Sequence, residues 1–135
     1  MTNALLLPII ILGLLHLVMV NWMLITRFRA LYLAKLAGTM PSSLRRLPDW
    51  AVNPANNYNN LTEAPPLFYA VTIAIILAGL ADKFYIICAW AFVGTRITHS
   101  LVHATINVIP LRAGLFGLSW VFLGVMIVRV AISLC

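Results

Sequence analysis

Residues 4–27 read ALLLPIIILGLLHLVMVNWMLITR, an apolar run that ends at a basic residue. About 20 apolar residues are enough for a helix to cross the hydrocarbon core of a bilayer. Three further apolar stretches of similar length occupy residues 62–81, 84–109 and 113–134. We therefore predict an all-α membrane protein: a single domain, residues 1–135, folded as a four-helix transmembrane bundle with a cytoplasmic loop over residues 28–61.

The composition also indicates that lipid is the main solvent of this chain. Hydrophobic residues make up 63% of the 135 residues and charged residues only 9%, which is far more apolar than a soluble domain. The net charge of +6 does not imply nucleic acid, because the basic residues flank apolar runs and form no patch on a polar domain. We expect membrane lipids as partners and no nucleic acid.

The distribution of basic residues predicts a topology. One side of the membrane carries Arg27, Arg29, Lys35, Arg45, Arg46 and Arg112. The other side has only Lys83 and Arg129, and Arg129 is close enough to the C-terminus to snorkel outward. The positive-inside rule then places both termini outside the cytoplasm. We expect a multi-pass integral membrane protein, and the short extramembrane segments favour a bacterial inner membrane.

The third apolar stretch carries the most informative polar residues. Arg96, His99, His103 and Asn107 follow one another at intervals of three, four and four residues. At about 100° per residue they fall within an arc of roughly 80° on a helix. A charged group near the bilayer centre costs at least about 2.5–3.5 kcal/mol. This stripe is therefore expected to face protein or a wet cavity.

Other polar residues are predicted to meet this stripe from the same side. Glu63 begins the second stretch, Arg27 ends the first, and Arg112 follows the third. With three arginines and one carboxylate, such a cavity would attract anions. Three alternatives stay open: the groups satisfy one another between helices, His99 and His103 with Glu63 bind a metal, or the stripe conducts protons or ions. Arg96 would oppose a bound cation, so we assign no metal.

Prolines and glycines predict local features of the second and fourth stretches. Pro65 and Pro66 lack the backbone N–H that a continuous helix needs, so the second helix either begins near them or is kinked there. The glycines of the fourth stretch are most simply positions where helices pack closely; they are Gly114, Gly117 and Gly124.

Several local motifs resemble those of the MAPEG family, the membrane-associated proteins of eicosanoid and glutathione metabolism. They are Asn60-x-x-Glu63 followed by prolines and aromatic residues, Arg96-x-x-His99, Pro110-x-Arg112, and the basic pair Arg27 and Arg29. Chain length, four apolar stretches and the long first loop also resemble this family. The resemblance covers essentially the whole chain.

The resemblance implies a homotrimer that binds glutathione between subunits on the cytoplasmic side, and a transferase or peroxidase activity on a lipophilic small-molecule substrate. Arginines would clamp the glutathione carboxylates, and Glu63 would take its ammonium group. Arg112 would stabilise the thiolate, with His103 as an additional donor or base. The residues implied in glutathione binding are Arg27, Asn56, Asn60, Glu63, Arg96 and His99.

The chain departs from the family pattern at the positions that matter for chemistry. Asn56 stands where glutathione-using members usually have an arginine, and His103 stands where they often have a tyrosine. Ala113 and Phe116 stand where some members carry a hydroxyl group. Two hypotheses follow: a glutathione-dependent enzyme, or a non-enzymatic lipid- or anion-binding membrane protein on the same scaffold.

Overall fold

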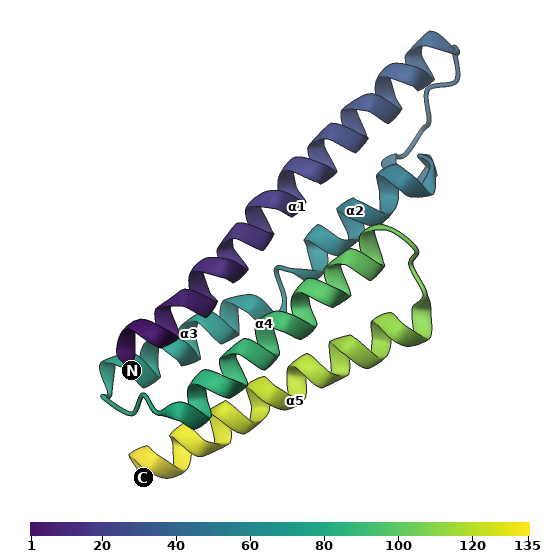
Figure 1. Cartoon of the computed structure of the whole chain (residues 1–135). Coiled ribbons are helices and arrows are strands. Elements are labelled where there is room, and N and C mark those ends of the chain that lie inside the picture. The colour runs from purple at the N-terminus through teal and green to yellow at the C-terminus, as the bar shows by residue number, and fades with distance from the viewer.

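The computed structural model describes all residues from Met1 to Cys135 as an elongated helical bundle without strands (Figure 1). Its elements are α1 (Thr2–Leu36), the short 3₁₀ helix η1 (Leu44–Arg46), α2 (Asp49–Asn60), α3 (Ala64–Leu77), α4 (Lys83–Ala104) and α5 (Ile109–Leu134). Four segments are long and apolar enough to span a membrane, and α2 with α3 forms the second of them, Asp49–Leu77. The predicted all-α class and four-helix transmembrane bundle are confirmed.

The segment 28–61, which we expected to be a loop, is largely helical. Helix α1 continues to Leu36 because residues 30–36, ALYLAKL, are mostly good helix formers, and it ends before Gly38 (φ +68°). Helix α2 contains the asparagine-rich run despite the low helix propensity of asparagine. Its Ala51 packs with Ala30 and Leu47 in a small apolar cluster, and such tertiary packing overrides a weak local preference.

The second span is broken between α2 and α3. Glu63 lies outside helical geometry (φ −92°, ψ −83°), and α3 begins at Ala64 with Pro65 and Pro66 in its first turn. Prolines fit this position because the first N–H groups of a helix have no partner within the helix. The helix therefore begins where the proline pair predicted a start or a kink.

Helix α4 lies at the centre of the bundle, with α5 beside it on the outside (Figure 1). Half of the α4 span is buried within the chain, against 17% of the α5 span. The rings of Phe68 and Phe92 stack in the core with their centroids 4.4 Å apart. A methyl group added at Gly114, Gly117 or Gly124 would meet no neighbouring atom within 4 Å, so these glycines do not pack against another helix of this chain.

Helix α4 ends earlier than its apolar pattern suggested. It stops at Ala104, and Asn107 adopts a left-handed backbone (φ +48°) in the turn before α5. Asparagine tolerates this conformation better than most residues. Asn107 therefore leaves the helical stripe of Arg96, His99 and His103, contrary to the sequence expectation.

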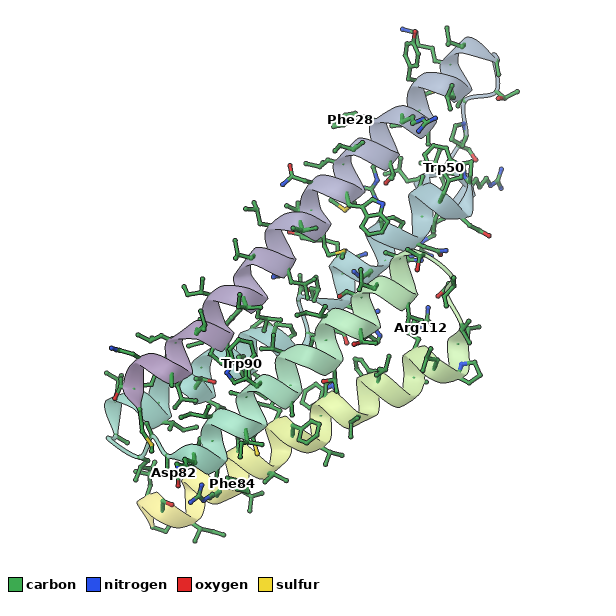
Figure 2. The ribbon with its side chains drawn as sticks, in the orientation of Figure 1. Phe28, Trp50, Asp82, Phe84, Trp90 and Arg112 are labelled. Atoms are coloured by element: carbon green, nitrogen blue, oxygen red, sulfur yellow. The ribbon has the colours of Figure 1, made fainter.

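An ion pair joins the α3–α4 turn to α5 at the end of the bundle that holds both termini. Arg129 donates to both carboxylate oxygens of Asp82, at 2.9 and 2.6 Å, instead of snorkelling freely outward. Asp82 Oδ1 also accepts the backbone N–H of Tyr85 and so caps α4. The Arg129 guanidinium lies 4.5 Å from the ring centroids of Phe84 and Tyr85. Figure 2 shows Asp82 and Phe84 together at this end.

Replacing Asp82 should lower thermal stability in a pH-dependent way. Hydrogen bonds from Arg129 lower the pKa of Asp82 below its ordinary value of 3.8, so its contribution is present above that value and is lost as the pH falls through the lowered pKa. Asp82→Asn keeps a cap and loses the charge, whereas Asp82→Ala loses both. We expect melting temperatures in the order wild type, Asp82→Asn, Asp82→Ala near neutral pH.

Thermal unfolding in detergent, followed by circular dichroism between about pH 7 and pH 3, measures this effect. The gap between wild type and Asp82→Asn should shrink toward the acid end, because the wild-type carboxylate becomes neutral there. A gap that stays constant over the whole range would contradict the role of the charge.

Candidate functional site

A network of two hydrogen bonds links the α2–α3 break to α4. Nη2 of Arg96 donates to the backbone oxygen of Asn60 at 3.0 Å. The Asn60 side-chain Nδ2 lies 3.1 Å from Nδ1 of His103. Because an amide nitrogen only donates, the ring accepts at Nδ1. Arg96 is 0% exposed and His103 2% exposed, so the α4 side of this network lies in the interior of the bundle.

Several polar side-chain atoms of α2 and α4 are buried without any hydrogen-bond partner. They are Nε and Nη1 of Arg96, Nδ1 of His99, Oγ of Ser100, and both side-chain polar atoms of Asn57. Buried polar groups are almost always satisfied in folded proteins, by protein atoms or by ordered water. These atoms make the interface between α2 and α4 an unusually polar part of the bundle interior.

Aromatic rings border the same cluster. The rings of His99 and His103 meet edge to face with centroids 5.6 Å apart. The Phe116 ring from α5 lies 5.7 Å from the Arg96 guanidinium carbon and 6.1 Å from the His99 ring. A cation over an aromatic face is stabilised by the ring quadrupole, so Phe116 partly offsets the cost of the charge that Arg96 carries into the bundle.

Arg112 is connected to α2 by two successive side-chain hydrogen bonds. Its Nη1 donates to Oδ1 of Asn107 at 2.7 Å, and Nδ2 of Asn107 donates to Oδ1 of Asn53 on α2 at 3.4 Å. Figure 2 shows Arg112 near the start of α5, at the end of the bundle opposite Asp82. Arg112 is half-buried, and no other acceptor in the chain bonds its guanidinium, so its remaining donors are available to a ligand.

Helix α2 supplies residues that the sequence reasoning missed. Asn53 and Asn57 are buried, and together with Asn60 they recur at intervals of four and three. This is the spacing of one helical face. The pattern was readable in the sequence, but only once residues 49–60 are recognised as a helix instead of a loop.

A separate polar pocket lies between the end of α1 and α2. Arg27 and Arg45 line it from α1 and η1, and Asn56 and Asn59 line it from α2. The pocket encloses about 220 Å³. Small-molecule sites usually enclose about 300–1,000 Å³, so this pocket is smaller than is usual for such a site. Arginines from two elements without a carboxylate in the lining favour an anionic ligand.

Glu63 lies outside both groups. It is exposed, and it precedes the first turn of α3 without a hydrogen bond from its side chain. The chain contains no group of three His, Cys, Asp or Glu side chains that could hold a metal ion. His99, His103 and Glu63 are not placed together in such a group.

The structure thus divides the predicted site residues into two sets. Asn60, Arg96 and His103 form the hydrogen-bonded network, the ring of His99 packs against that of His103, and Arg112 approaches through Asn107. Arg27 and Asn56 share the polar pocket. None of the five principal cavities is lined by Arg96, His99, His103 or Arg112. These five cavities do not bring the predicted residues together in a single open site.

Comparison with known proteins gives one match. The sequence model of the MAPEG family matches residues 5–132, nearly the whole chain. No curated protein and no solved structure matches it.

Substitutions at His103 should separate a hydrogen bond from simple packing. His103→Leu removes the acceptor and leaves the half-buried Asn60 amide without this partner, at a cost of about 0.5–1.5 kcal/mol in the free energy of unfolding. His103→Gln can accept the same bond through its side-chain oxygen and should lose clearly less. Denaturant titration in mixed micelles measures both values. Equal losses in the two variants would contradict a stabilising bond between Asn60 and His103.

Proposed function

The chain belongs to the MAPEG family, and from this membership we propose that it binds glutathione at a cytoplasm-facing site between subunits. There it acts as a glutathione transferase or peroxidase on lipophilic substrates. The observation that carries the proposal is the polar pocket of Arg27, Arg45, Asn56 and Asn59. It is the one principal cavity that combines two arginines with polar amides.

The chemistry of glutathione fits the residues around α2. Glutathione has two carboxylates, one ammonium group and a thiol. Arg27 and Arg45 suit a carboxylate, since a guanidinium offers two parallel donors. The exposed carboxylate of Glu63, which has no partner in this chain, suits the ammonium group. Asn56 and Asn59 supply further hydrogen bonds to the peptide backbone of the ligand.

The buried network supports this site by positioning α2. Arg96 has no exposed surface, and its one hydrogen bond goes to the backbone of Asn60. In this chain Arg96 therefore acts through Asn60 and fixes the end of the helix that carries Asn56 and Asn59. Its role is positioning and does not require direct contact with glutathione.

Arg112 is the group proposed to activate the thiol. A nearby cation lowers a thiol pKa below its usual value of about 8.5 and so raises the fraction of thiolate. In a transferase reaction the thiol gives its proton to water and the thiolate sulfur bonds to the electrophilic carbon; in a substitution the bond from that carbon to its leaving group breaks and the group departs with the electron pair, and in an addition the displaced π electrons take up a proton from water. In a peroxidase reaction two thiols form a disulfide while the hydroperoxide becomes an alcohol and water.

Two features support completion of the site by further copies of the chain, as a homotrimer. The polar pocket is smaller than a typical ligand site. The glycines of α5 present an open, unfilled face, and small residues allow close approach of a second helix in a membrane. The lipophilic substrate would enter from the bilayer, which surrounds the exposed apolar side chains.

The proposed membrane orientation follows from charge. Both termini lie at the end of the bundle opposite the basic residues of the α1–α2 region (Figure 1). The positive-inside rule places that basic end in the cytoplasm and the termini outside. The bacterial inner membrane is the proposed location.

A non-enzymatic lipid- or anion-binding role on the same scaffold is the second candidate, and one observation favours it. Phe116 presents an apolar ring to Arg96 and His99, and Nδ1 of His103 is already engaged by Asn60. Together with Ala113 this leaves Arg112 as the single obvious donor to a thiolate.

Activity measurements on Arg112 decide between these candidates. Purified protein is mixed with glutathione and a chromogenic electrophile, and conjugate formation and binding heat are recorded. Arg112→Ala should reduce turnover by about a hundredfold or more, because it removes the charge that stabilises the thiolate, while size-exclusion chromatography shows unchanged assembly. Lys83→Ala makes the same change of charge at the opposite end and should keep full activity.

No conjugate and no binding heat at millimolar glutathione with the wild type would reject the glutathione proposal. Activity that persists in Arg112→Ala would remove Arg112 from the mechanism but leave the ligand in place.

Replacing Asn56 with arginine, the residue that glutathione-using members usually have at this position, should strengthen glutathione binding. Asn56 is exposed and lines the polar pocket beside Arg27. An exposed ion pair contributes about 0.2–1 kcal/mol, so Asn56→Arg should tighten the dissociation constant by up to about fivefold. Isothermal titration calorimetry measures the change. Ser42→Arg adds the same charge outside the pocket and should have little effect; an equal gain in both variants would indicate general attraction instead of a clamp.

A further inference from the structure

A second cavity is lined by residues of α1, η1 and the η1–α2 connection. It encloses about 450 Å³, which is within the range of small-molecule sites. The end of α1 forms one wall with Ala30, Leu33 and Ala34, and the opposite wall contains Leu47. Arg46 is the one charged residue in its lining, which also includes Trp50.

The surroundings of this cavity have the composition of a membrane–water interface. Trp50 is 43% exposed, and Arg29 lies over its ring at 5.8 Å. Figure 2 shows Phe28 and Trp50 at this end of the bundle. Tryptophan and arginine together are typical of the headgroup level, where an aromatic body faces lipid and a charged group faces phosphate.

The segment that surrounds this cavity is strongly basic. Five of the nine Lys and Arg residues fall between residues 27 and 46, whereas Asp49 is the one acidic residue before Glu63. An apolar wall with a single guanidinium, set in a basic region, is complementary to a molecule that has one anionic head and an apolar tail. Anionic phospholipids have this chemistry, and they are enriched in the leaflet that basic segments face.

We propose that the cavity between α1 and the η1–α2 connection is a binding site for one anionic phospholipid. The lipid phosphate pairs with Arg46, with Arg29 at the rim, the glycerol ester region lies against Leu33, Ala34 and Leu47, and the acyl chains run back along α1 toward the hydrocarbon layer. The site is distinct from the polar pocket, because Arg46 faces the cavity while its neighbour Arg45 lines the pocket. The proposal does not depend on glutathione.

Native mass spectrometry of the full chain in mild detergent tests this site. The protein is titrated separately with phosphatidylglycerol and with phosphatidylcholine, and inorganic phosphate is added as a competitor. We expect the wild type to retain phosphatidylglycerol in preference to phosphatidylcholine. Arg46→Gln should lose on the order of tenfold in affinity for phosphatidylglycerol, because a charge-assisted hydrogen bond is removed. Arg46 is exposed, so this variant should fold.

Two further variants complete the test. Lys35→Gln removes the same charge from an exposed position near the cavity that does not line it. The lipid affinity of this variant should stay within about twofold, because a charge without direct contact to the phosphate is largely screened by salt. Ala34→Phe fills the apolar wall and should weaken binding of both lipids. The proposal is overturned by equal retention of the two lipids, by equal losses in Lys35→Gln and Arg46→Gln, or by displacement of lipid with millimolar phosphate, which would indicate a free-anion site.

Discussion

The polar interior of this protein depends on two consecutive prolines. Pro65 and Pro66 have no N–H to donate, so the second span cannot run as one regular helix. Helix α2 ends at Asn60 and α3 begins at Ala64. The Asn60 carbonyl accepts only a long bond of 3.3 Å from the Glu63 N–H and none from Ala64, so it can also accept Nη2 of Arg96. An interruption in one helix thus provides the partner that allows a guanidinium to be buried in the neighbouring helix.

The residues of the candidate site lie on both faces of α2. Asn53, Asn57 and Asn60 face α4, where they meet the buried network and the turn at Asn107. Asn56 and Asn59 face the polar pocket with Arg27. Helix α2 is therefore a short polar wall between an enclosed cluster and an open pocket. A substitution that shifts α2 would therefore alter both the buried network and the polar pocket.

The length and periodicity of apolar and polar residues predicted much of this fold. The features that the sequence did not predict depend on tertiary contacts. The four spans follow from apolar length, and the common face of Arg96, His99 and His103 follows from intervals of three and four. The helical state of residues 49–60 was missed, because asparagine-rich segments favour loops unless packing overrides them. The Asp82–Arg129 pair joins residues 47 apart, and no local pattern contains that information. The polar pocket likewise depends on how α1 and α2 cross.

Helix α4 also fixes a length that the surrounding membrane must match. Its residues, Lys83–Ala104, number 22 and span about 33 Å at the usual helical rise. Asp82 and Arg129 hold charge at one end, and Asn107 and Arg112 hold polar groups at the other. Two polar belts at this separation suit a hydrocarbon layer of about 30 Å. A markedly thicker bilayer would have to thin around the protein or let it tilt, so hydrophobic mismatch alone gives this chain a preference among membranes.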